Sequence, residues 1–395
     1  MSEKRVVLFD IGILATATRL RGIGRYVSEL GRGLAALKQE WGDIQLVFLE
    51  GLSFDGTVTL SPELEPAIER LTQGPVRSRY SWAYPLRLFA GLAASRAGAS
   101  LLHLPAPGAT PLALGGVPHV VTCHDLIPYK FPQHYAGIDE GFRWGRRALD
   151  RRRYGSARHV IAISQATATD LEQLLGLRAD AVSTVLSGID ATRWVAPRDA
   201  DDAEQLRRLN LTGKRFVAYV GDIDWRKNME GMISALAEAR KSDDSLELVW
   251  VGKPSSPSRE QACRAHAAAC GVTNACQFLG YVPDAGLQAV YRAALATLLV
   301  SRAEGFGYPV LEAMASGCPV IASSVSSLPE VAENAALLVD PESPRDIADA
   351  ILQLAQGPAR RSDLIERGRR RAAELNLVAQ ARGTLDVYRR LLRAI

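Results

Sequence analysis

The sequence predicts an α/β protein built from two doubly wound domains, each with a mostly parallel sheet. Three observations predict this fold class. Short apolar runs rich in β-branched residues alternate with longer amphipathic runs, which is typical of a sheet covered by helices on both faces. The alternation runs through the first half of the chain and restarts after a polar stretch near residue 200. With 395 residues, 47% of them apolar, the chain can bury two such cores.

The strand-like runs fall into two sets. The first set predicts strands at residues 6–9, 44–49, 101–104, 119–122, 160–163 and 183–186. The second set predicts strands at residues 216–220, 246–251, 276–279, 296–300, 319–322 and 336–339. Because helix-length segments separate the runs within each set, each set predicts one Rossmann-like sheet.

A polar stretch over residues 190–211 separates the two sets and shows no apolar period beyond a helix start. We therefore expect a linker there, with a first domain over residues 1–195 and a second over residues 196–375. Residues 376–395 carry a final helical run. Ligands of doubly wound sheets bind at the carboxyl ends of the strands, so we expect a ligand in a cleft between two such edges.

The composition favours a cytoplasmic protein and does not indicate nucleic-acid binding. The net charge of +4 is too small for that over this length, and the basic surplus lies in residues 1–200. Five cysteines form an odd and sparse set, unlike a secreted disulfide framework. The apolar run 6–9 ends at Asp10 with no cleavage site after it, as in a first strand rather than a signal peptide. No uncharged apolar run approaches the roughly 18 residues of a membrane span.

One group of residues has a spacing that could suit zinc. Cys263, His266, Cys270 and Cys276 lie within a short stretch. The stretch lacks paired Cys-x-x-Cys knuckles and runs through an alanine-rich helical segment. We therefore expect no zinc here.

A glycine-containing segment opens the first predicted helix. Gly22 and Gly24, followed by Arg25, stand where backbone N–H groups at a positive helix end can approach an anion. A dinucleotide fingerprint needs a third glycine, and Ser28 stands at that position. The pattern therefore favours an anion-contacting loop over a nicotinamide or flavin site, and a loop without a ligand is the alternative.

His124 and Asp125 follow a predicted strand end, which is where the active sites of α/β proteins lie. By itself the pair indicates little. Asp125 could equally cap a helix and leave His124 on the surface.

Adjacent cations follow the first strand of the second domain. Arg226 and Lys227 stand a few residues after Gly221, just before a helix begins. Cations at a helix start oppose the helix dipole, so we expect an anion such as phosphate to compensate them. Asp222 and Asp224 also match the Asp-x-Asp of some metal-dependent nucleotide-sugar enzymes. Such a short pattern recurs by chance, and those enzymes have one sheet, so we expect no metal.

Residues 301–322 read as strand, glycine loop, helix and strand. Pro309 suits a first helical turn and Gly317 a helix end. Glu304 then falls in the loop and Glu312 in the helix, both at the mouth of the sheet.

Glu304 and Glu312, with seven residues between them, resemble the donor site of the retaining glycosyltransferases of family four, which have the GT-B fold. That fold has two Rossmann-like domains facing across a cleft, and its last helix crosses back to the first domain, as 376–395 could. Further motifs match in order: Gly22-Ile23-Gly24-Arg25, His124-Asp125, Ile163-Ser164-Gln165-Ala166-Thr167, Ser187-Gly188-Ile189-Asp190, Arg226-Lys227-Asn228 and Ser326-Ser327-Leu328-Pro329-Glu330. Within the family, the chain is similar to bacterial mannosyltransferases of O-antigen and exopolysaccharide synthesis.

The resemblance implies roles for individual residues. Arg226 and Lys227, beside Gly221, would bind the donor diphosphate, Glu312 the ribose hydroxyls, and Glu304 would lie beside the donor sugar. The other implied contacts are those of the amides of Gly305, Phe306 and Gly307 with the phosphates, of Gly22, Gly24 and Arg25 with the acceptor and diphosphate, and of His124 with the sugar. The implied catalytic residues are Glu304, His124, Lys227 and Arg226. In one departure from the family's pattern, Asp222 stands where many members carry a second Arg.

The implied reaction moves a hexose from a nucleotide sugar to a glycan or polyprenyl-diphosphate-linked saccharide, without a metal or other cofactor. Mannose from GDP-mannose is the first candidate, and two cations with a helix N-terminus could stabilise the leaving diphosphate. Two alternatives share the architecture. One is a two-lobed sugar-binding protein and the other a sugar-nucleotide epimerase.

A basic segment in the first domain suggests contact with an anionic membrane. It contains Arg143, Arg146, Arg147, Arg151, Arg152, Arg153 and Arg158. Asp150 opposes them between residues 141 and 160, and Phe142, Trp144 and Tyr154 are interleaved. The segment predicts an amphipathic helix on the inner face of the plasma membrane, or simply a solvated helix face.

Overall fold

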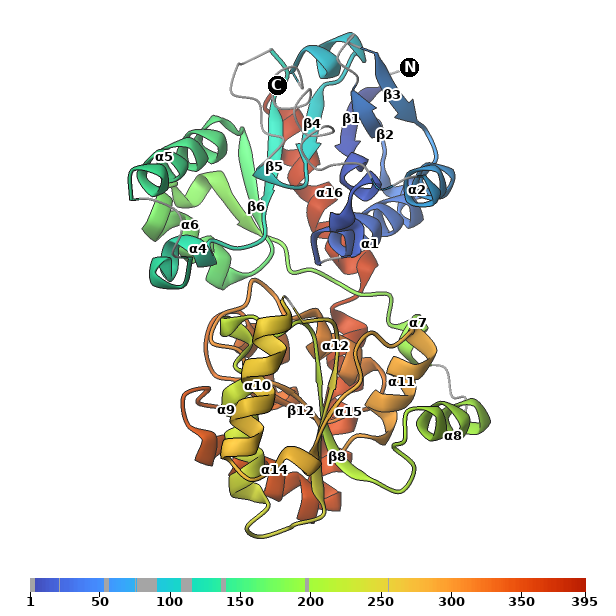
Figure 1. The fold of residues 1–395 in the computed structure, drawn as a ribbon. Coiled ribbons are helices and arrows are strands. Elements are labelled where there is room, and N and C mark those ends of the chain that lie inside the picture. Colours follow the sequence, from blue (N-terminus) through green and yellow to red (C-terminus); the bar gives the residue numbers. More distant parts are fainter. Residues whose placement is uncertain are drawn as a thin grey trace. The chain divides into compact units, whose positions relative to one another are not determined.

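The computed structural model describes residues 4–20, 22–52, 57–74, 76, 91–107, 116–135, 140–195, 199–254 and 256–395. The chain forms two compact units. The first comprises Met1–Gly188 and Asn376–Ile395, and the second comprises Ile189–Leu375. Each unit is built around its own sheet with helices on both faces (Figure 1).

The first unit has a seven-stranded sheet of order β3-β2-β1-β4-β5-β6-β7. Its strands are β1 (Arg5–Asp10), β2 (Ile44–Leu52), β3 (Val58–Ser61), β4 (Leu101–Leu104), β5 (His119–Cys123), β6 (His159–Ala162) and β7 (Val182–Thr184). All neighbours are parallel except β2 and β3. β4, β5 and β6 are buried along their whole length, which explains their continuous apolar runs.

The sequence analysis missed β3. This antiparallel edge strand has only Ser61 buried, so it carries no apolar run of its own. The pairing with β2 shifts register between Leu49 and Gly51, as in a β-bulge. Glu50, at the bulge, is buried and accepts a hydrogen bond from Arg70 at 2.6 Å.

The second unit has a six-stranded parallel sheet of order β10-β9-β8-β11-β12-β13. Its strands are β8 (Arg215–Val220), β9 (Leu246–Val251), β10 (Cys276–Phe278), β11 (Ala296–Leu299), β12 (Val320–Ser323) and β13 (Leu337–Val339). Each strand predicted for either domain overlaps one of the observed strands, so two doubly wound sheets are confirmed.

Helices flank both sheets. Those of the first unit are α1 (Gly22–Ala36), α2 (Leu64–Gln73), α4 (Ile127–Lys130), α5 (Glu140–Ser156), α6 (Gln165–Leu175) and α16 (Leu377–Arg393). Those of the second are α7 (Thr192–Val195), α8 (Asp199–Arg208), α9 (Met229–Ala239), α10 (Pro257–Ala269), α11 (Asp284–Ala293), α12 (Tyr308–Ala315), α13 (Leu328–Ala332), α14 (Pro344–Gln356) and α15 (Pro358–Glu374). None of the helices described is both long and apolar enough to cross a membrane.

The expected linker over residues 190–211 is helical instead. It forms α7 and α8, and Asp202 of α8 accepts hydrogen bonds from Arg292 of α11 at 2.5 and 2.6 Å. Arg193, in α7, likewise pairs with Asp284 of α11. Trp194 of α7 is buried and its ring packs edge-on against Tyr291 of α11, so an aromatic contact adds to these ion pairs. The first unit ends at Gly188.

The C-terminal helix α16 belongs to the first unit and packs on α1, beside it in Figure 1. A Cβ at Gly33 of α1 would lie 2.2 Å from the carbonyl oxygen of Leu377, so glycine permits this close packing. The two places where the chain passes between units lie next to each other. A Cβ at Gly188 would lie 2.1 Å from the carbonyl oxygen of Asn376, and Ile189 N donates to Leu375 O at 3.0 Å.

Candidate active site

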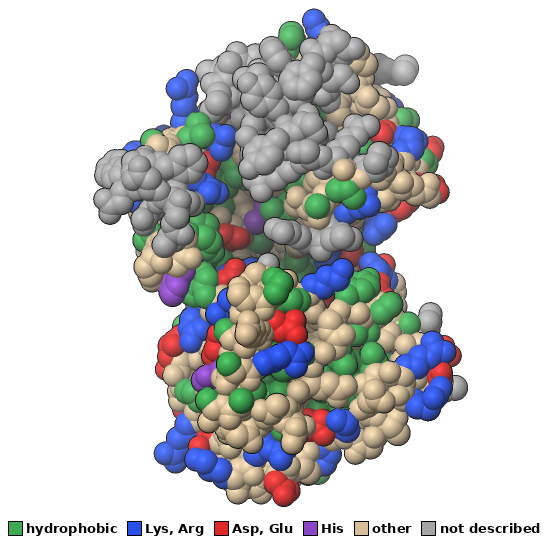
Figure 2. Space-filling view, viewed as in Figure 1, with side chains coloured by type: hydrophobic (Ala, Val, Ile, Leu, Met, Phe, Trp, Pro, Cys, Tyr) green, Lys and Arg blue, Asp and Glu red, His purple; other side chains and the backbone are tan. Residues whose placement is uncertain are grey.

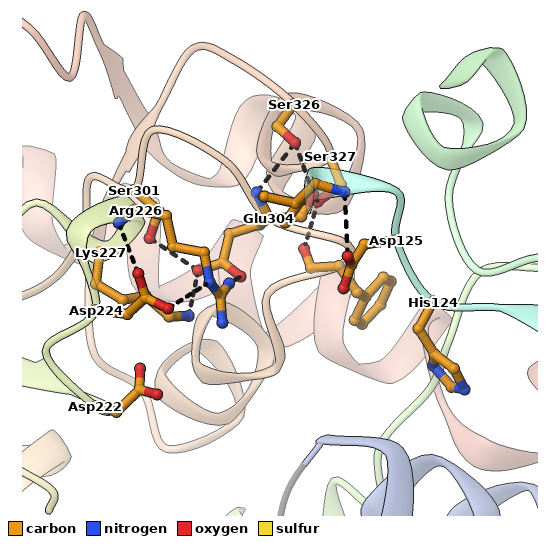
Figure 3. A network of polar contacts seen from close by, with 12 residues as sticks. His124, Asp125, Asp222, Asp224, Arg226, Lys227, Ser301, Glu304, Ser326 and Ser327 are labelled. Carbon is orange, nitrogen blue, oxygen red and sulfur yellow. Dashed lines mark hydrogen bonds and ion pairs between the residues drawn. The ribbon is translucent and has the colours of Figure 1, made fainter. Parts of the chain in front are cut away.

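The candidate site of the second unit centres on the carboxylate of Glu304, in the loop after β11. Lys227 Nζ donates to Oε1 at 2.5 Å, and Arg226 Nη1 donates to Oε2 at 3.0 Å (Figure 3). Ser301 Oγ adds a third hydrogen bond, at 2.8 Å. Burial alone would raise the pKa of Glu304, but Lys227 and Arg226 outweigh it and hold this pKa below its usual value. Glu304 is therefore a buried carboxylate kept ionised by two cations.

The loop that carries the two cations is fixed at both ends. Asp224 Oδ1 accepts from the backbone N–H of Arg226 at 3.2 Å and caps the short turn that contains Lys227. Asn228 follows with φ of 60°, in the left-handed region that asparagine tolerates. Its buried side-chain amide donates to the carbonyls of Val300 at 3.2 Å and Pro341 at 2.6 Å.

Arg302 also holds this loop, and the sequence analysis did not single it out. Its backbone N–H donates to Arg226 O at 2.7 Å, and its Nη1 donates to Trp225 O at 3.0 Å. Its Nε donates to Glu342 at 2.6 Å. Arg302 thus ties the loop after β11 to the loop after β8.

The glycine loop after Glu304 is held by two serines. Ser326 Oγ accepts from Glu304 N at 3.1 Å and donates to Glu304 O at 2.6 Å. Ser327 Oγ lies 3.1 Å from Glu304 O and 3.0 Å from Phe306 O. Gly307 has φ of 107°, and a Cβ there would lie 2.5 Å from a Leu328 methyl, so only glycine fits. These two serines belong to a motif quoted above for the resemblance alone.

Glu312 lies in α12, where the sequence analysis placed it. It is buried, and Tyr291 donates its hydroxyl to Oε2 at 2.9 Å. Pro309 occupies the first turn of α12, and Gly317, with φ of 78°, follows its end, as predicted. The amides of Gly305, Phe306 and Gly307 lie just before the positive end of this helix.

Gly221 directly follows β8 with φ of 148°, and its carbonyl accepts from Trp250 Nε1 at 2.7 Å. A Cβ at Gly252, which follows β9, would lie 1.9 Å from that carbonyl, so the two loops approach closely. Asp222 is exposed, whereas Asp224 is occupied by its contacts with Arg226. Across the described ranges, no group of three or more His, Cys, Asp or Glu side chains could hold a metal ion.

In the first unit, α1 begins at Gly22, as predicted. Gly24 is required there, because a Cβ would lie 2.4 Å from the Cα of Arg19, whereas a Cβ at Gly22 would meet nothing within 4 Å. Arg25 Nε lies 3.8 Å from the buried Glu29.

His124 follows β5, and its ring is held on two sides. Its Nε2 lies 2.7 Å from Pro105 O, and the Tyr26 ring meets it edge-on with centroids 4.8 Å apart. Burial lowers the pKa of His124, although the Pro105 carbonyl and Asp125 oppose that effect. Asp125 Oδ1 accepts from Ile127 N at 3.2 Å in a turn just before α4. The residue that caps α4 is Leu126, so Asp125 is not the helix cap named above as an alternative. His124 is not a plain surface side chain either.

Comparisons with known proteins identify the family of this chain. Residues 20–193 match the model described as Glycosyltransferase Family 4, and residues 201–371 match that described as Glycosyl transferases group 1. A D-inositol 3-phosphate glycosyltransferase of Frankia alni is 31% identical, over 94% of this chain and 95% of that protein. The chain belongs to glycosyltransferase family 4. An O-antigen chain mannosyltransferase B of Escherichia coli is 27% identical, over 69% of this chain and 70% of that protein.

Solved structures confirm the GT-B fold of this family 4 glycosyltransferase. Sucrose-phosphate synthase from Thermosynechococcus elongatus has a TM-score of 0.74 at 23% identity, covering 99% of this chain and 100% of its own. HepE from Anabaena, solved with UDP and glucose, has a TM-score of 0.72 at 18% identity, covering 97% and 99%. At these identities the likeness establishes the fold alone.

The basic segment of this glycosyltransferase is α5 and the turn after it. Arg146, Arg147, Arg151, Arg152 and Arg158 are exposed. Tyr154, interleaved with these arginines in the sequence, is 3% exposed and packs in the core. Asp150 also points inward, where it pairs with Arg153 and accepts from Tyr129. The side chains of Phe142, Arg143 and Trp144 lie outside the described part of the structure.

The cysteines and the histidine whose spacing was weighed for zinc do not form a group of three or more metal ligands among the described residues. Cys263 is buried, and His266 Nε2 lies 2.8 Å from Ser234 Oγ and 3.6 Å from Cys270 Sγ.

On the face of the second unit that Figure 2 shows, basic and acidic side chains are interspersed. That mixture differs from the basic exposed face of α5.

Proposed function

We propose that this glycosyltransferase transfers a hexose, with retention of anomeric configuration and without a metal, from a nucleotide sugar to a saccharide hydroxyl. The observation that carries the proposal is the convergence of Arg226 and Lys227 on Glu304. These residues follow β8 and β11, which are neighbours in the sheet, so they lie at its carboxyl edge. Ligands of doubly wound sheets bind at that edge.

In this proposal the two cations serve the donor diphosphate. An Arg carries five N–H donors and a Lys three, so each can contact Glu304 and still donate to a phosphate oxygen. As the sugar–phosphate bond breaks, negative charge grows on the diphosphate, and Arg226 and Lys227 stabilise it. The amides of Gly305, Phe306 and Gly307 add donors at the positive end of α12.

Glu304 is a poor candidate for a nucleophile, because both of its oxygens accept hydrogen bonds and two cations neutralise its charge. We therefore place it beside the donor sugar, with attack by the acceptor hydroxyl on the face of the leaving group. The new bond joins the acceptor oxygen to the anomeric carbon. The bond between the anomeric carbon and the phosphate oxygen breaks, and the acceptor's proton passes to that departing oxygen. Glu312 then takes the ribose hydroxyls, and His124 faces the sugar.

GDP-mannose is the proposed donor, with a glycan or polyprenyl-diphosphate-linked saccharide as acceptor. The O-antigen chain mannosyltransferase relative supports this pair. The more extensive match to D-inositol 3-phosphate glycosyltransferase favours a second acceptor class, a small phosphorylated polyol. In either case Gly22, Gly24 and Arg25 of the first unit would contact the acceptor or the diphosphate.

A panel of nucleotide sugars tests the function. We expect one of them to raise the melting temperature and to be consumed only when an acceptor is present. The released product, analysed by NMR, would keep the anomeric configuration of the donor. Tight binding of free sugar without turnover would instead indicate a binding protein, and conversion of the donor without an acceptor would indicate an epimerase.

The acceptor would be presented at a membrane, through the arginines of α5. Arg146, Arg151 and Arg152 are exposed, while Asp150 is turned inward. Each cation near an anionic leaflet contributes about 1 kcal/mol of binding free energy before screening. We propose peripheral binding on the cytoplasmic face.

A further inference from the structure

Four buried polar side chains form a hydrogen-bonded network, called the polar network below, that runs through the first unit from its C-terminal helix. The Tyr388 hydroxyl of α16 lies 2.6 Å from Nδ1 of His103, in β4. His103 Nε2 lies 2.8 Å from Thr122 Oγ1, in β5. Thr122 Oγ1 in turn lies 3.0 Å from the hydroxyl of Tyr26, in α1. All four side chains are at most 1% exposed, so water does not compete for these bonds.

The polar network leads to His124 through the ring of Tyr26. The Tyr26 ring stands at 90° to the His124 ring, with centroids 4.8 Å apart. A second contact of the His124 ring is the carbonyl of Pro105, which directly follows β4, the strand that carries His103. These two contacts of the ring therefore come from elements that the polar network joins.

The hydrogen bonds of the polar network all run in the same donor-to-acceptor direction. Burial, with a smaller effect of the nearby His124, lowers the pKa of His103 to about 3, so its ring is neutral at neutral pH. A neutral imidazole donates through one nitrogen and accepts through the other. If Nδ1 donates to Tyr388, then Nε2 accepts from Thr122, whose oxygen accepts from Tyr26, and the other tautomer reverses each bond.

Loss of one hydroxyl therefore affects all the hydrogen bonds of the polar network. It leaves a buried nitrogen or hydroxyl without a partner, which is more unfavourable than the loss of an exposed hydrogen bond. Because hydrogen bonds in a low-dielectric interior polarise one another, the remaining bonds weaken as well.

We propose that Tyr388, His103, Thr122 and Tyr26 are positioning residues that hold the ring of His124 at the angle from which it meets the donor sugar. The inference rests on the proposed function for the role of His124. It assigns to the C-terminal helix a part in the chemistry of the first unit, through the hydroxyl of Tyr388.

The test combines NMR of histidine-labelled protein with steady-state kinetics. Tyr388→Phe keeps the ring and removes the hydroxyl. We expect it to shift and broaden the His124 ring signals and to lower kcat about tenfold, with the donor KM within about twofold of wild type. Tyr26→Phe should shift the His124 signals and lower kcat in the same way. The double variant should lower kcat no further than either single variant, because one substitution already interrupts the polar network. Tyr129→Phe is the matched control, because it removes a hydroxyl that is bonded to Asp150 and does not belong to the polar network.

Thr122→Ser and Thr122→Val cover the case in which a tyrosine variant does not fold, because serine keeps the hydroxyl and valine keeps the shape. We expect only valine to move the His124 signals. Unchanged His124 signals and unchanged kcat in Tyr388→Phe, or equal effects of Tyr129→Phe, would overturn the proposal. If the protein transfers no hexose, the proposed function fails, while the His124 NMR signals still show whether the polar network positions the ring. If transfer occurs but displaced His124 signals leave kcat unchanged, positioning fails and the function stands.

Discussion

Lys227 Nζ lies 2.5 Å from Glu304 Oε1, joining two loops that are 77 residues apart in the sequence. Arg226 binds the other oxygen of the same carboxylate. Glu304 therefore holds the two cations together near the amides of the glycine loop. A diphosphate that approaches this site meets a pair of cations already fixed in place, which is the preorganisation that electrostatic catalysis requires.

Turnover is expected to survive chelation. The proposed phosphate contacts are Arg226, Lys227 and backbone amides, and the Asp224 carboxylate is occupied by Arg226. Transfer measured in EDTA should equal transfer in untreated buffer, with a metal-dependent glycosyltransferase treated alongside as control. Complete loss of turnover in EDTA, restored by manganese, would mean that Asp222 and Asp224 bind a metal.

Arg302→Ala should raise the donor KM and lower kcat/KM about tenfold. The variant removes the guanidinium that holds the carbonyl of Trp225, so the loop bearing Arg226 loses part of its support, at about 1–2 kcal/mol. Arg345→Ala is the control, because Arg345 is exposed and makes only a 4.0 Å pair with Asp349 among the ion pairs described. Wild-type donor affinity in Arg302→Ala would show that the loop does not need this support.

Substituting Arg146, Arg151 and Arg152 together by Ser should weaken binding to anionic liposomes. At about 1 kcal/mol per cation, the loss is on the order of a hundredfold at low salt, and it shrinks as salt rises. Arg208, Arg345 and Arg370, exposed in the second unit, provide a matched triple substitution. Equal sedimentation of wild type with neutral and anionic vesicles at all salt concentrations would contradict the electrostatic claim.

Asp10→Asn should stabilise the protein above pH 7. Burial raises the pKa of Asp10 to about 7, although the backbone N–H of Gly12 opposes this, and Oδ2 has no hydrogen-bond partner. A carboxyl whose pKa is higher in the folded state than in the unfolded state gives stability that is complete below pH 3.8 and lost as the pH rises to about 7. Asparagine avoids this loss, with a ceiling of ~4 kcal/mol in the free energy of unfolding. Denaturant titrations at pH 4 and pH 8 check it, and a variant less stable than wild type at pH 8 would contradict it.

The sheets were predictable because their strands are buried on both faces and so form continuous apolar runs. β3 and α8 were not, since one buries only Ser61 and the other is held to α11 by the Asp202–Arg292 pair. Such elements depend on tertiary contacts that no local pattern records.

At the site, Glu304, Lys227 and Arg226 were each predictable from loop position and charge. Their ion pairs were not, because they depend on β8 and β11 being neighbours in the sheet, and chain order does not reveal that order. The position of Tyr154 shows the same limit. The sequence shows it interleaved with arginines, and only the packing of the helix shows that its ring lies in the core.

In the proposed function, Arg226 and Lys227 bind the diphosphate and Glu304 acts on the sugar. Titration calorimetry of the nucleoside diphosphate, with turnover at saturating donor, tests it most directly in Glu304→Ala. Glu304→Gln and Lys227→Ala serve as comparisons. We predict that diphosphate binding stays nearly unchanged in Glu304→Ala, because Arg226 and Lys227 are still present, while turnover falls on the order of a hundredfold or more. Loss of diphosphate binding with turnover intact would contradict the account.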